Sequence, residues 1–358
     1  MQDERHEEMR RETPRRMRAA PGRRKEPPTL SERRAREDGR GRDAPSPWRI
    51  PVRGWRDVFW RAVEGYTRDR IAPNAAGAAF FLMFAIVPTL AALVALFGLV
   101  ADPEVLSEQL DDLQGFLPQG LIDLIASELD RLIAAQTNTL SLTFALSMAV
   151  ALWIINAAVL ALFDALNVIY GEEEKRPLLL LYARSLLFTL ATLIFAFLLI
   201  NAVVGVPVVL GYLPFGALGR ALIAISPAVI LFLVANVGIA ALYRYGPSRA
   251  PARWLWITPG SLTASAVWLI GSAGFSYYVS HLTDFSATYG SLGTIAAAMM
   301  WVWISTVILL VGAEIDAEAE HQTACDTTLA PERPMGARGA VVADQVGPAR
   351  VDREESAR

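Results

Sequence analysis

Cysteine and histidine are scarce in this chain of 358 residues, which limits the chemistry that its side chains can perform. Cys325 is the single cysteine, and the three histidines, His6, His281 and His321, are far apart in the sequence. A disulfide within the chain is excluded, and a cysteine–histidine metal cluster is not expected. The glycine-rich stretches lack the Gly-Lys-Ser/Thr ending of a phosphate-binding loop. The sequence therefore predicts no cofactor, no metal and no catalytic residues, and a protein that is not an enzyme.

Charge is also scarce, but only in the middle of the chain. Of 33 Lys and Arg residues, 20 precede Asn74 and 5 follow Asp316. Six uncharged windows lie between the remaining charges, and each exceeds the roughly 20 apolar residues that a helix needs to cross a membrane. A soluble helical protein would spread its charge through the chain, so the windows favour a membrane protein.

The sequence predicts an all-α fold, a polytopic membrane helical bundle with about six transmembrane helices. The expected domain covers residues 72–316, with spans at about 77–100, 140–163, 178–204, 221–243, 258–280 and 292–314. Residues 102–138 are too polar to cross a membrane, but their apolar side chains recur at helical spacing. This pattern predicts an amphipathic helical lid on the extracytoplasmic side.

The two ends of the chain are polar. Residues 1–47 are rich in Arg, Glu, Pro and Gly, and both they and residues 317–358 are expected to be disordered tails. Residues 48–71 differ, because Trp55, Phe59, Ala62 and Tyr66 form one helical stripe flanked by arginines. The stripe predicts an amphipathic helix at the membrane interface that contacts anionic lipid headgroups. A helix packed on the bundle is the alternative, and the two can coexist.

Loop charges predict the orientation. The basic residues fall in alternate loops, namely Lys175, Arg176 and Arg184 after the second span, and Arg244, Arg249 and Arg253 after the fourth. The other loops hold at most one basic residue each. Because cytoplasmic loops carry an excess of Lys and Arg, both termini are expected in the cytoplasm of a bacterial inner (plasma) membrane protein.

Three blocks of sequence resemble the YihY/virulence factor BrkB family of bacterial inner-membrane proteins, also labelled ribonuclease BN-like. They are AAGAAFFLMFAIVPTL, then LWIINAAVLALFDALNVIYGEEEKR, and then LYRYGP with ITPGSLTASAVWLIGSAGFSYYV and YGSLGTIAAAMMWVWISTVILLVGAEIDAE. The first block has Ala85 where the family usually has serine. The resemblance implies a six-helix membrane bundle but no settled molecular activity.

Polar residues inside the predicted spans are the candidate site. They are Asn156, Asp164 and Asn167 of the second span, Ser261, Ser265, Ser272 and Ser276 of the fifth, and Tyr289 and Glu314 beside the sixth. Such groups either line a hydrated path or form contacts between helices. Glu314 is expected to pair with a loop arginine such as Arg244, as a lock between helices or as a proton-coupling site.

The predicted function is that of a transporter or a lipid- and envelope-maintenance protein, with a solute or lipid substrate that the sequence does not identify. A membrane scaffold is the alternative, and a membrane-associated ribonuclease has the least support. Membrane lipids are the expected partners. Nucleic acid is not expected as a partner, because acidic residues alternate with the arginines of the N-terminal tail. A homo-oligomer is compatible with the sequence.

Overall fold

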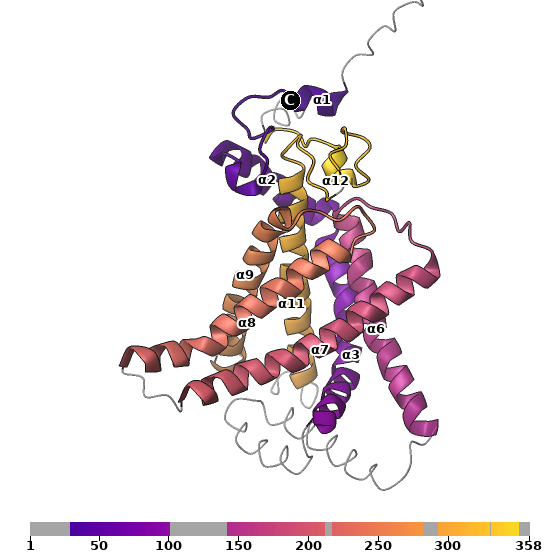
Figure 1. Cartoon of the computed structure of the whole chain (residues 1–358), viewed down its shortest axis with the longest axis vertical. Helices are drawn as coiled ribbons and strands as arrows, with labels where there is room; N and C mark the ends of the chain where they lie inside the picture. The colour runs from indigo at the N-terminus through magenta and orange to yellow at the C-terminus, as the bar shows by residue number, and fades with distance from the viewer. Residues whose placement is uncertain (1–28, 101–141, 212–216, 282–292, 330, 351–358) are drawn as a thin grey trace, which may run out of the picture.

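A computed structural model describes residues 29–100, 142–211, 217–281, 293–329 and 331–350 (Figure 1). The regular structure in these residues is helical, apart from one isolated bridge between Ala252 and Thr328. Six helices are 28 to 34 residues long: α3 (Ile71–Val100), α6 (Leu142–Ile169), α7 (Leu178–Gly211), α8 (Ala217–Tyr245), α9 (Trp254–His281) and α11 (Gly293–Glu320). The predicted all-α helical bundle is confirmed. The predicted lid, residues 102–138, lies outside the described residues.

The long helices have the composition of membrane spans. Among the described residues, four segments are long and apolar enough to cross a membrane: Ala149–Ile169, Leu178–Leu198, Ile225–Tyr245 and Ile295–Glu320. The segment Ile71–Ile86 is a shorter apolar helix. On α8, Ile225, Val229, Leu233 and Val237 recur every fourth residue and are about half exposed. An apolar stripe of this kind is unfavourable in water and is expected on a surface that faces lipid.

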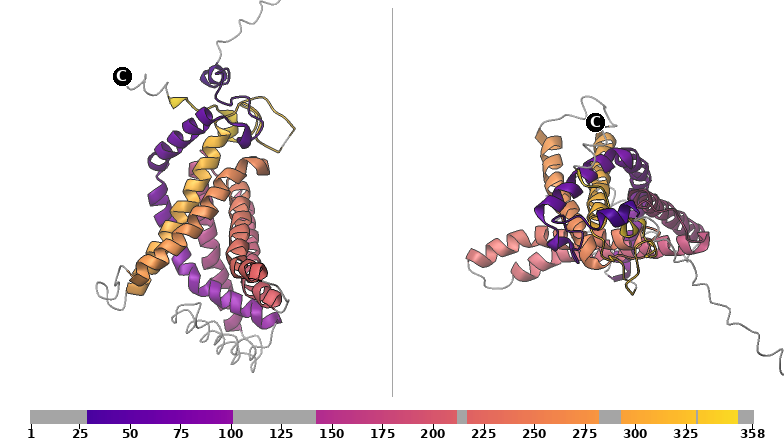
Figure 2. Two further views of the ribbon diagram at one scale, coloured as in Figure 1. Left: turned by 90° about the vertical axis from the view of Figure 1, so that its left-hand side faces the viewer. Right: turned by 90° about the horizontal axis from the view of Figure 1, so that it is seen from above.

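The helices α3 and α11 lie side by side in the middle of the bundle, with α6 packed on α3 and α9 packed on α11 (Figures 1 and 2). The helices α7 and α8 contact each other along their length and extend to one side of the other four. This arrangement puts residues from all six helices around the centre of the bundle.

Two glycines let α9 and α11 approach closely. A Cβ added at Gly260 would lie 2.1 Å from the carbonyl oxygen of Gly312, and one added at Gly312 would lie 2.7 Å from Cβ of Ala264. The contact depends on the missing side chains, because small residues allow helix backbones to pack against each other in a membrane.

Both polar tails fold over one end of the bundle, which we call the tail end (Figures 1 and 2). The short helices α1 (Leu30–Arg34), η2 (Pro47–Arg49) and α12 (Val341–Asp344) belong to these segments. We call residues 29–50 and 321–350 together the tail cap. Arg42, Gln322, Val342 and Ala343 of the tail cap are at most 2% exposed. These parts of the tails are therefore folded, contrary to the expected disorder. Buried arginines donate hydrogen bonds to backbone carbonyl oxygens of the tails. These bonds satisfy buried backbone groups in segments that contain few apolar residues.

The helix α2 (Val52–Arg68) was predicted as the interfacial helix and has two distinct faces. Asp57, Arg61 and Gly65 are buried on the face that packs against α11. Phe59 and Val63 are exposed on the opposite face, by 60% and 47%. The alternative of a packed helix therefore holds, and an apolar face remains free to meet a membrane. Trp55 belongs instead to the packed region around Trp256.

Candidate functional site

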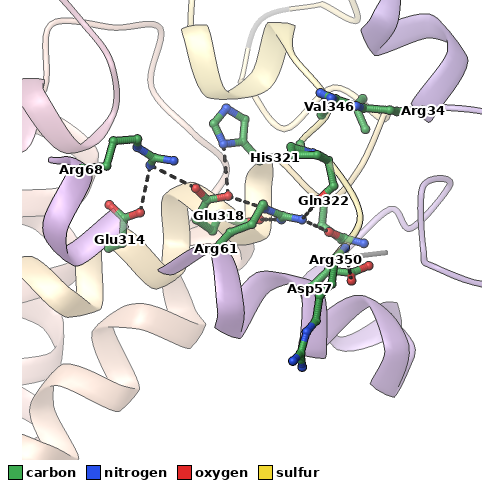
Figure 3. Close-up of polar contacts among 12 residues, drawn as sticks. Arg34, Asp57, Arg61, Arg68, Glu314, Glu318, His321, Gln322, Val346 and Arg350 are labelled. Atoms are coloured by element: carbon green, nitrogen blue, oxygen red, sulfur yellow. Dashed lines mark hydrogen bonds and ion pairs between the residues drawn. The ribbon is translucent and has the colours of Figure 1, made fainter. Parts of the chain in front are cut away.

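A cluster of polar side chains joins α2 to the last turns of α11 (Figure 3). Arg61 donates from Nε to Oε2 of Glu318 (2.6 Å), from Nη2 to the carbonyl oxygen of Glu318 (2.7 Å) and from Nη1 to Oε1 of Gln322 (2.8 Å). The side chains of Arg61 and Glu318 are 3% and 2% exposed. Removing Glu318 would leave the Arg61 guanidinium buried without this carboxylate, and removing Arg61 would leave Glu318 with only the longer contacts to Arg68 (3.3 Å) and His321 (3.4 Å); either loss is costly. We call Arg61, Glu318 and Gln322 the Arg61 cluster.

Glu314 pairs with an arginine of α2 instead of the expected Arg244. Oε1 of Glu314 lies 3.3 Å from Nη2 of Arg68, and Glu314 is 1% exposed. Gly65 makes room for this carboxylate, because an added Cβ would lie 1.8 Å from its Oε1. Arg244 donates to the carbonyl oxygen of Ala252. The expected pairing with Arg244 is therefore not seen, and the role of Glu314 as a lock between helices or as a proton-coupling site stays a prediction.

Two further carboxylates of α11 tie it to other elements. Oδ1 of Asp316 accepts the backbone N–H of Gly260 on α9 (2.6 Å). Glu320 pairs with Arg249 at 2.7 Å, and both side chains are fully buried. Burial opposes the charge on Arg249, but Glu320 holds the pKa of Arg249 above its ordinary value. The guanidinium also lies over the ring of Tyr170, 4.1 Å from its centroid. The end of α11 is thus fixed to α6, α9 and the loop after α8.

Arginines of other elements bind the C-terminal segment, residues 339–348, which we call the strap. Arg34, Arg42 and Arg61 donate to the carbonyl oxygens of Val346 (3.2 Å), Gly347 (2.9 Å) and Pro348 (3.2 Å), respectively. These contacts connect the C-terminal segment to the N-terminal segment and to α2. Bonds to charged donors are stronger than neutral ones, and they add to the burial of Val342 and Val346 in holding this segment in place.

The strap also reaches the two interhelical loops at this end. The backbone N–H of Val341 donates to Oε1 of Glu172 after α6 (2.7 Å). The backbone N–H of Ala250 after α8 donates to the carbonyl oxygen of Gly339 (2.9 Å). The tail cap therefore contacts both loops at the tail end, residues 170–177 and 246–253.

Asn167 anchors the same two loops to each other. Its Oδ1 accepts the backbone N–H of Ser248 (2.7 Å), and its Nδ2 donates to Glu174 (3.2 Å). Glu174 also pairs with Arg176 at 2.6 Å, and hydrogen bonds from Arg176 lower the pKa of Glu174 to about 2. Asn167 belongs to this network, whereas Asp164 is exposed on another face of α6.

Three further candidates, on α6 and α9, are hydrogen-bonded within the bundle. Asn156 is buried and accepts a hydrogen bond from Thr189 of α7 (3.3 Å). Ser265 donates to the carbonyl oxygen of Ser261 (2.8 Å), and Ser272 to that of Trp268 (2.7 Å). These two hydroxyl protons are therefore directed into the backbone of α9.

The last three candidates lie elsewhere. Ser261 also accepts a hydrogen bond from Asn236 of α8 (3.2 Å), which makes it a contact between helices. Ser276 is exposed near the far end of α9. Tyr289 lies outside the described residues.

A cavity of about 780 Å³ occupies the centre of the bundle. Its size falls within the roughly 300–1,000 Å³ of small-molecule sites. All six long helices contribute to its wall, for example through Ile86, Val159, Thr189, Leu242, Trp268 and Thr306. None of the described residues that line it is charged. Sequence reasoning missed this cavity, because spacing along one helix does not show which faces of six helices meet.

A closely packed layer separates the cavity from the tail end. The residues that follow the cavity wall are almost completely buried on three helices, namely Phe163 of α6, Tyr243 of α8 and Leu310 of α11, and so is Tyr170 directly after α6. On α11, Glu318 of the Arg61 cluster follows Leu310 toward the tail end, and the tail cap begins directly after α11. Sequence reasoning also missed the role of Arg61, although the acidic run after Gly312 could have indicated a basic partner.

The described residues contain no group of three His, Cys, Asp or Glu side chains arranged to hold a metal ion. What they do contain, long apolar helices around an apolar cavity with many charged side chains gathered at the tail end, defines a polytopic helical membrane protein. The chain belongs to the Virulence factor BrkB family, whose model matches residues 62–336. The family expected from the three sequence blocks is thereby confirmed.

The relatives are named as membrane proteins or by a nuclease-like label. The chain is 27% identical to the putative ribonuclease-like protein YfkH of Bacillus subtilis, over 70% of this chain and 91% of that protein. It is 24% identical to a UPF0761 membrane protein of Aeromonas salmonicida, over 70% of this chain and 85% of that protein. No solved structure matches the chain significantly.

Proposed function

We propose that this chain is a transporter of the bacterial inner membrane, with its tail end and both termini in the cytoplasm. The observation that carries the proposal is the central cavity, to which all six long helices contribute. A bundle that served only to hold partners would gain stability by filling such a space, because interiors are otherwise closely packed.

The layout of the bundle supports a molecule that opens at one end. The cavity is separated from the tail end by the buried layer, and beyond it the Arg61 cluster and the strap join the surrounding elements. Ion pairs and backbone hydrogen bonds can be exchanged for water when they separate, so opening at this end would separate these polar contacts together with the helices of the buried layer. The tail end is therefore the part of the protein that we expect to open and close during transport.

The cytoplasmic position of the tail end is supported by its loops. Lys175, Arg176, Arg249 and Arg253 all lie in the loops at this end, together with the basic residues of the tail cap. Such an excess of positive charge is typical of cytoplasmic segments. The proposal includes no enzymatic activity. The ribonuclease-like name belongs to the relative from Bacillus subtilis.

Distances between two spin labels at the tail end test the proposal. In a Cys325→Ser background, labels are placed at Val52→Cys on α2 and Leu179→Cys on α7, both of which are 85% exposed. A transporter in lipid nanodiscs should show two distance populations, whose ratio changes when Glu318→Gln weakens the Arg61 cluster. A control pair at Leu179→Cys and Leu187→Cys, on one helix, should show a single distance. One unchanged population for the first pair would contradict transport.

A membrane scaffold is the second candidate, and the folded tail cap is the observation that favours it. The cap presents ordered surface at the end where charged residues gather. A scaffold would keep one conformation, so the same spin-label experiment distinguishes it from a transporter.

A further inference from the structure

The wall of the central cavity is almost entirely hydrocarbon. Leucine, isoleucine, valine and alanine side chains from the six helices form most of it, together with four aromatic side chains, Phe188, Phe195, Trp268 and Trp301. Five hydroxyl residues interrupt the apolar wall: Thr89, Thr189, Thr192, Ser305 and Thr306. The chemistry of the occupant depends on whether these hydroxyls are free to bind it.

Three of the hydroxyls already have partners inside the protein. Thr306 donates to the carbonyl oxygen of Val302 (2.8 Å), and Thr189 donates to Oδ1 of Asn156 (3.3 Å). Ser305 accepts the indole N–H of Trp268 (3.1 Å). The wall therefore provides little hydrogen bonding to replace the water around a polar solute or an ion. Burying a polar group without a partner costs roughly 2–7 kcal/mol, and burying an unpaired charge costs far more.

The cavity also reaches the apolar surface of the bundle. Val237 of α8 and Thr192 of α7 both line the cavity and are exposed on the outside of the molecule. They belong to the pair of helices that extends to one side of the bundle in Figures 1 and 2. In a membrane this surface faces lipid, so the molecule nearest to the opening is a lipid acyl chain.

We propose that the central cavity binds a hydrocarbon chain of a membrane lipid, which enters sideways beside α7 and α8. The inference deepens the proposed function, on which it rests for the membrane setting, by naming the substrate class of the same cavity. An acyl chain loses no hydration on leaving the bilayer and contacts aliphatic and aromatic side chains on all sides. The polar headgroup stays at the opening, outside the apolar wall.

Photocrosslinking from a lipid chain tests the proposal. The full chain is reconstituted in vesicles of phosphatidylethanolamine and phosphatidylglycerol that contain a phosphatidylglycerol with a diazirine in its acyl chain. Adducts are expected on Ala158, Val159, Leu242 and Thr306, which line the cavity and are at most 8% exposed. Lipids that merely surround the bundle cannot reach these residues, but they should label exposed residues such as Leu233.

Two variants block the opening and one serves as control. Thr192→Trp should abolish the adducts on the four cavity residues and leave those on Leu233 unchanged. Ala235→Trp on α8 gives the same test if the first variant does not elute as a folded protein. The control Leu187→Trp adds the same side chain to an exposed position of α7 outside the cavity, and it should preserve all adducts.

The outcomes separate this inference from the proposed function. Normal labelling of Leu233 without adducts on the four cavity residues would overturn lipid binding, whatever the spin labels show. Modification of Thr306→Cys by a charged thiol reagent would also overturn it, because the cavity would then be hydrated. Cavity adducts combined with a single spin-label distance would support the lipid site and contradict transport.

Discussion

Arg61 and Glu318 are both withdrawn from solvent, and Arg61 donates to the side chain and to the backbone carbonyl oxygen of Glu318. Such a pair contributes little net stability compared with apolar residues of the same size, but it makes the position of each charge depend on the other. The pair therefore fixes how α2 sits on α11, and it can be broken without disturbing the cavity wall.

Arg61→Met should destabilise the protein, because Glu318 would lose its closest buried cation and keep only the longer contacts to Arg68 (3.3 Å) and His321 (3.4 Å). Breaking a buried pair by removing one partner costs about 3–5 kcal/mol. Denaturant unfolding in detergent micelles measures the change. The control Arg56→Met alters an exposed arginine of the same helix and should have little effect. The double variant Arg61→Met/Glu318→Met should recover part of the loss, and no recovery would mean that the pair is not the cause.

Gly65→Ala should also destabilise the protein, for a steric reason. The added Cβ would lie 1.8 Å from Oε1 of Glu314, so the carboxylate must leave its place beside Arg68. Overpacking of this kind typically costs about 1–3 kcal/mol. Gly77→Ala is the matched control, because a Cβ there meets no atom within 4 Å. Equal unfolding midpoints for the two variants would contradict the close contact.

Several residue roles could not be read from the sequence. Glu314 contacts an arginine, but this is Arg68 and not the expected Arg244. The choice of partner depends on how α2 crosses α11, which the periodicity of the sequence does not reveal. Ser265 and Ser272 were correctly placed on one face of a helix. Whether their hydroxyls bind backbone or line a path depends on rotamers that the sequence does not fix.

At the scale of elements, α2 combines a packed face and an exposed apolar face. We expect a peptide of residues 50–70 to bind anionic vesicles and become helical, with an affinity that falls as salt rises. Phe59→Ser should weaken binding more than Arg56→Gln, since a buried aromatic ring contributes about 1.5–3 kcal/mol and one basic residue about 1 kcal/mol. Circular dichroism during vesicle titration measures both. If the affinity of the peptide does not depend on the charge of the lipid, packing on α11 would be the only role of α2.

The loop after α6 should lose stability in acid. Hydrogen bonds from Arg176 lower the pKa of Glu174 to about 2 from its ordinary value of 4.5. Its stabilising contribution is therefore complete above pH 4.5 and disappears as the pH falls through about 2. Thermal unfolding of the wild type and Glu174→Gln should differ at pH 6, and the two midpoints should converge toward pH 2. A difference that stays constant with pH would contradict this role of the Glu174 charge.

The elements show clearly what composition can and cannot predict. All six expected spans overlap long helices over most of their length, and the last begins one residue before α11. Such helices depend on local apolar runs that cross a membrane. The tail cap was missed because its order depends on distant pairs, such as Arg42 with the carbonyl oxygen of Gly347. Low hydrophobicity predicts disorder only when such partners are absent.

The orientation of the whole molecule can be tested by labelling. In a Cys325→Ser background, Leu329→Cys places a thiol at an exposed position of the tail cap. An impermeant thiol reagent should label this cysteine only after cells are permeabilised. A cysteine at Ser127, in the segment expected outside the cytoplasm, should react in intact cells. Labelling of Leu329→Cys from outside would reverse the proposed orientation, since both loops at the tail end carry basic residues.

The central claim is that the bundle moves a lipid whose chain occupies the cavity. It is tested most directly by vesicles that contain the purified protein and a phosphatidylglycerol with a fluorescent headgroup, with a reductant that quenches only the outer leaflet. The protein should increase movement between leaflets, with or without a proton gradient. Thr192→Trp should abolish this increase, and Leu187→Trp should preserve it. Movement no faster than in protein-free vesicles under both conditions would contradict the account.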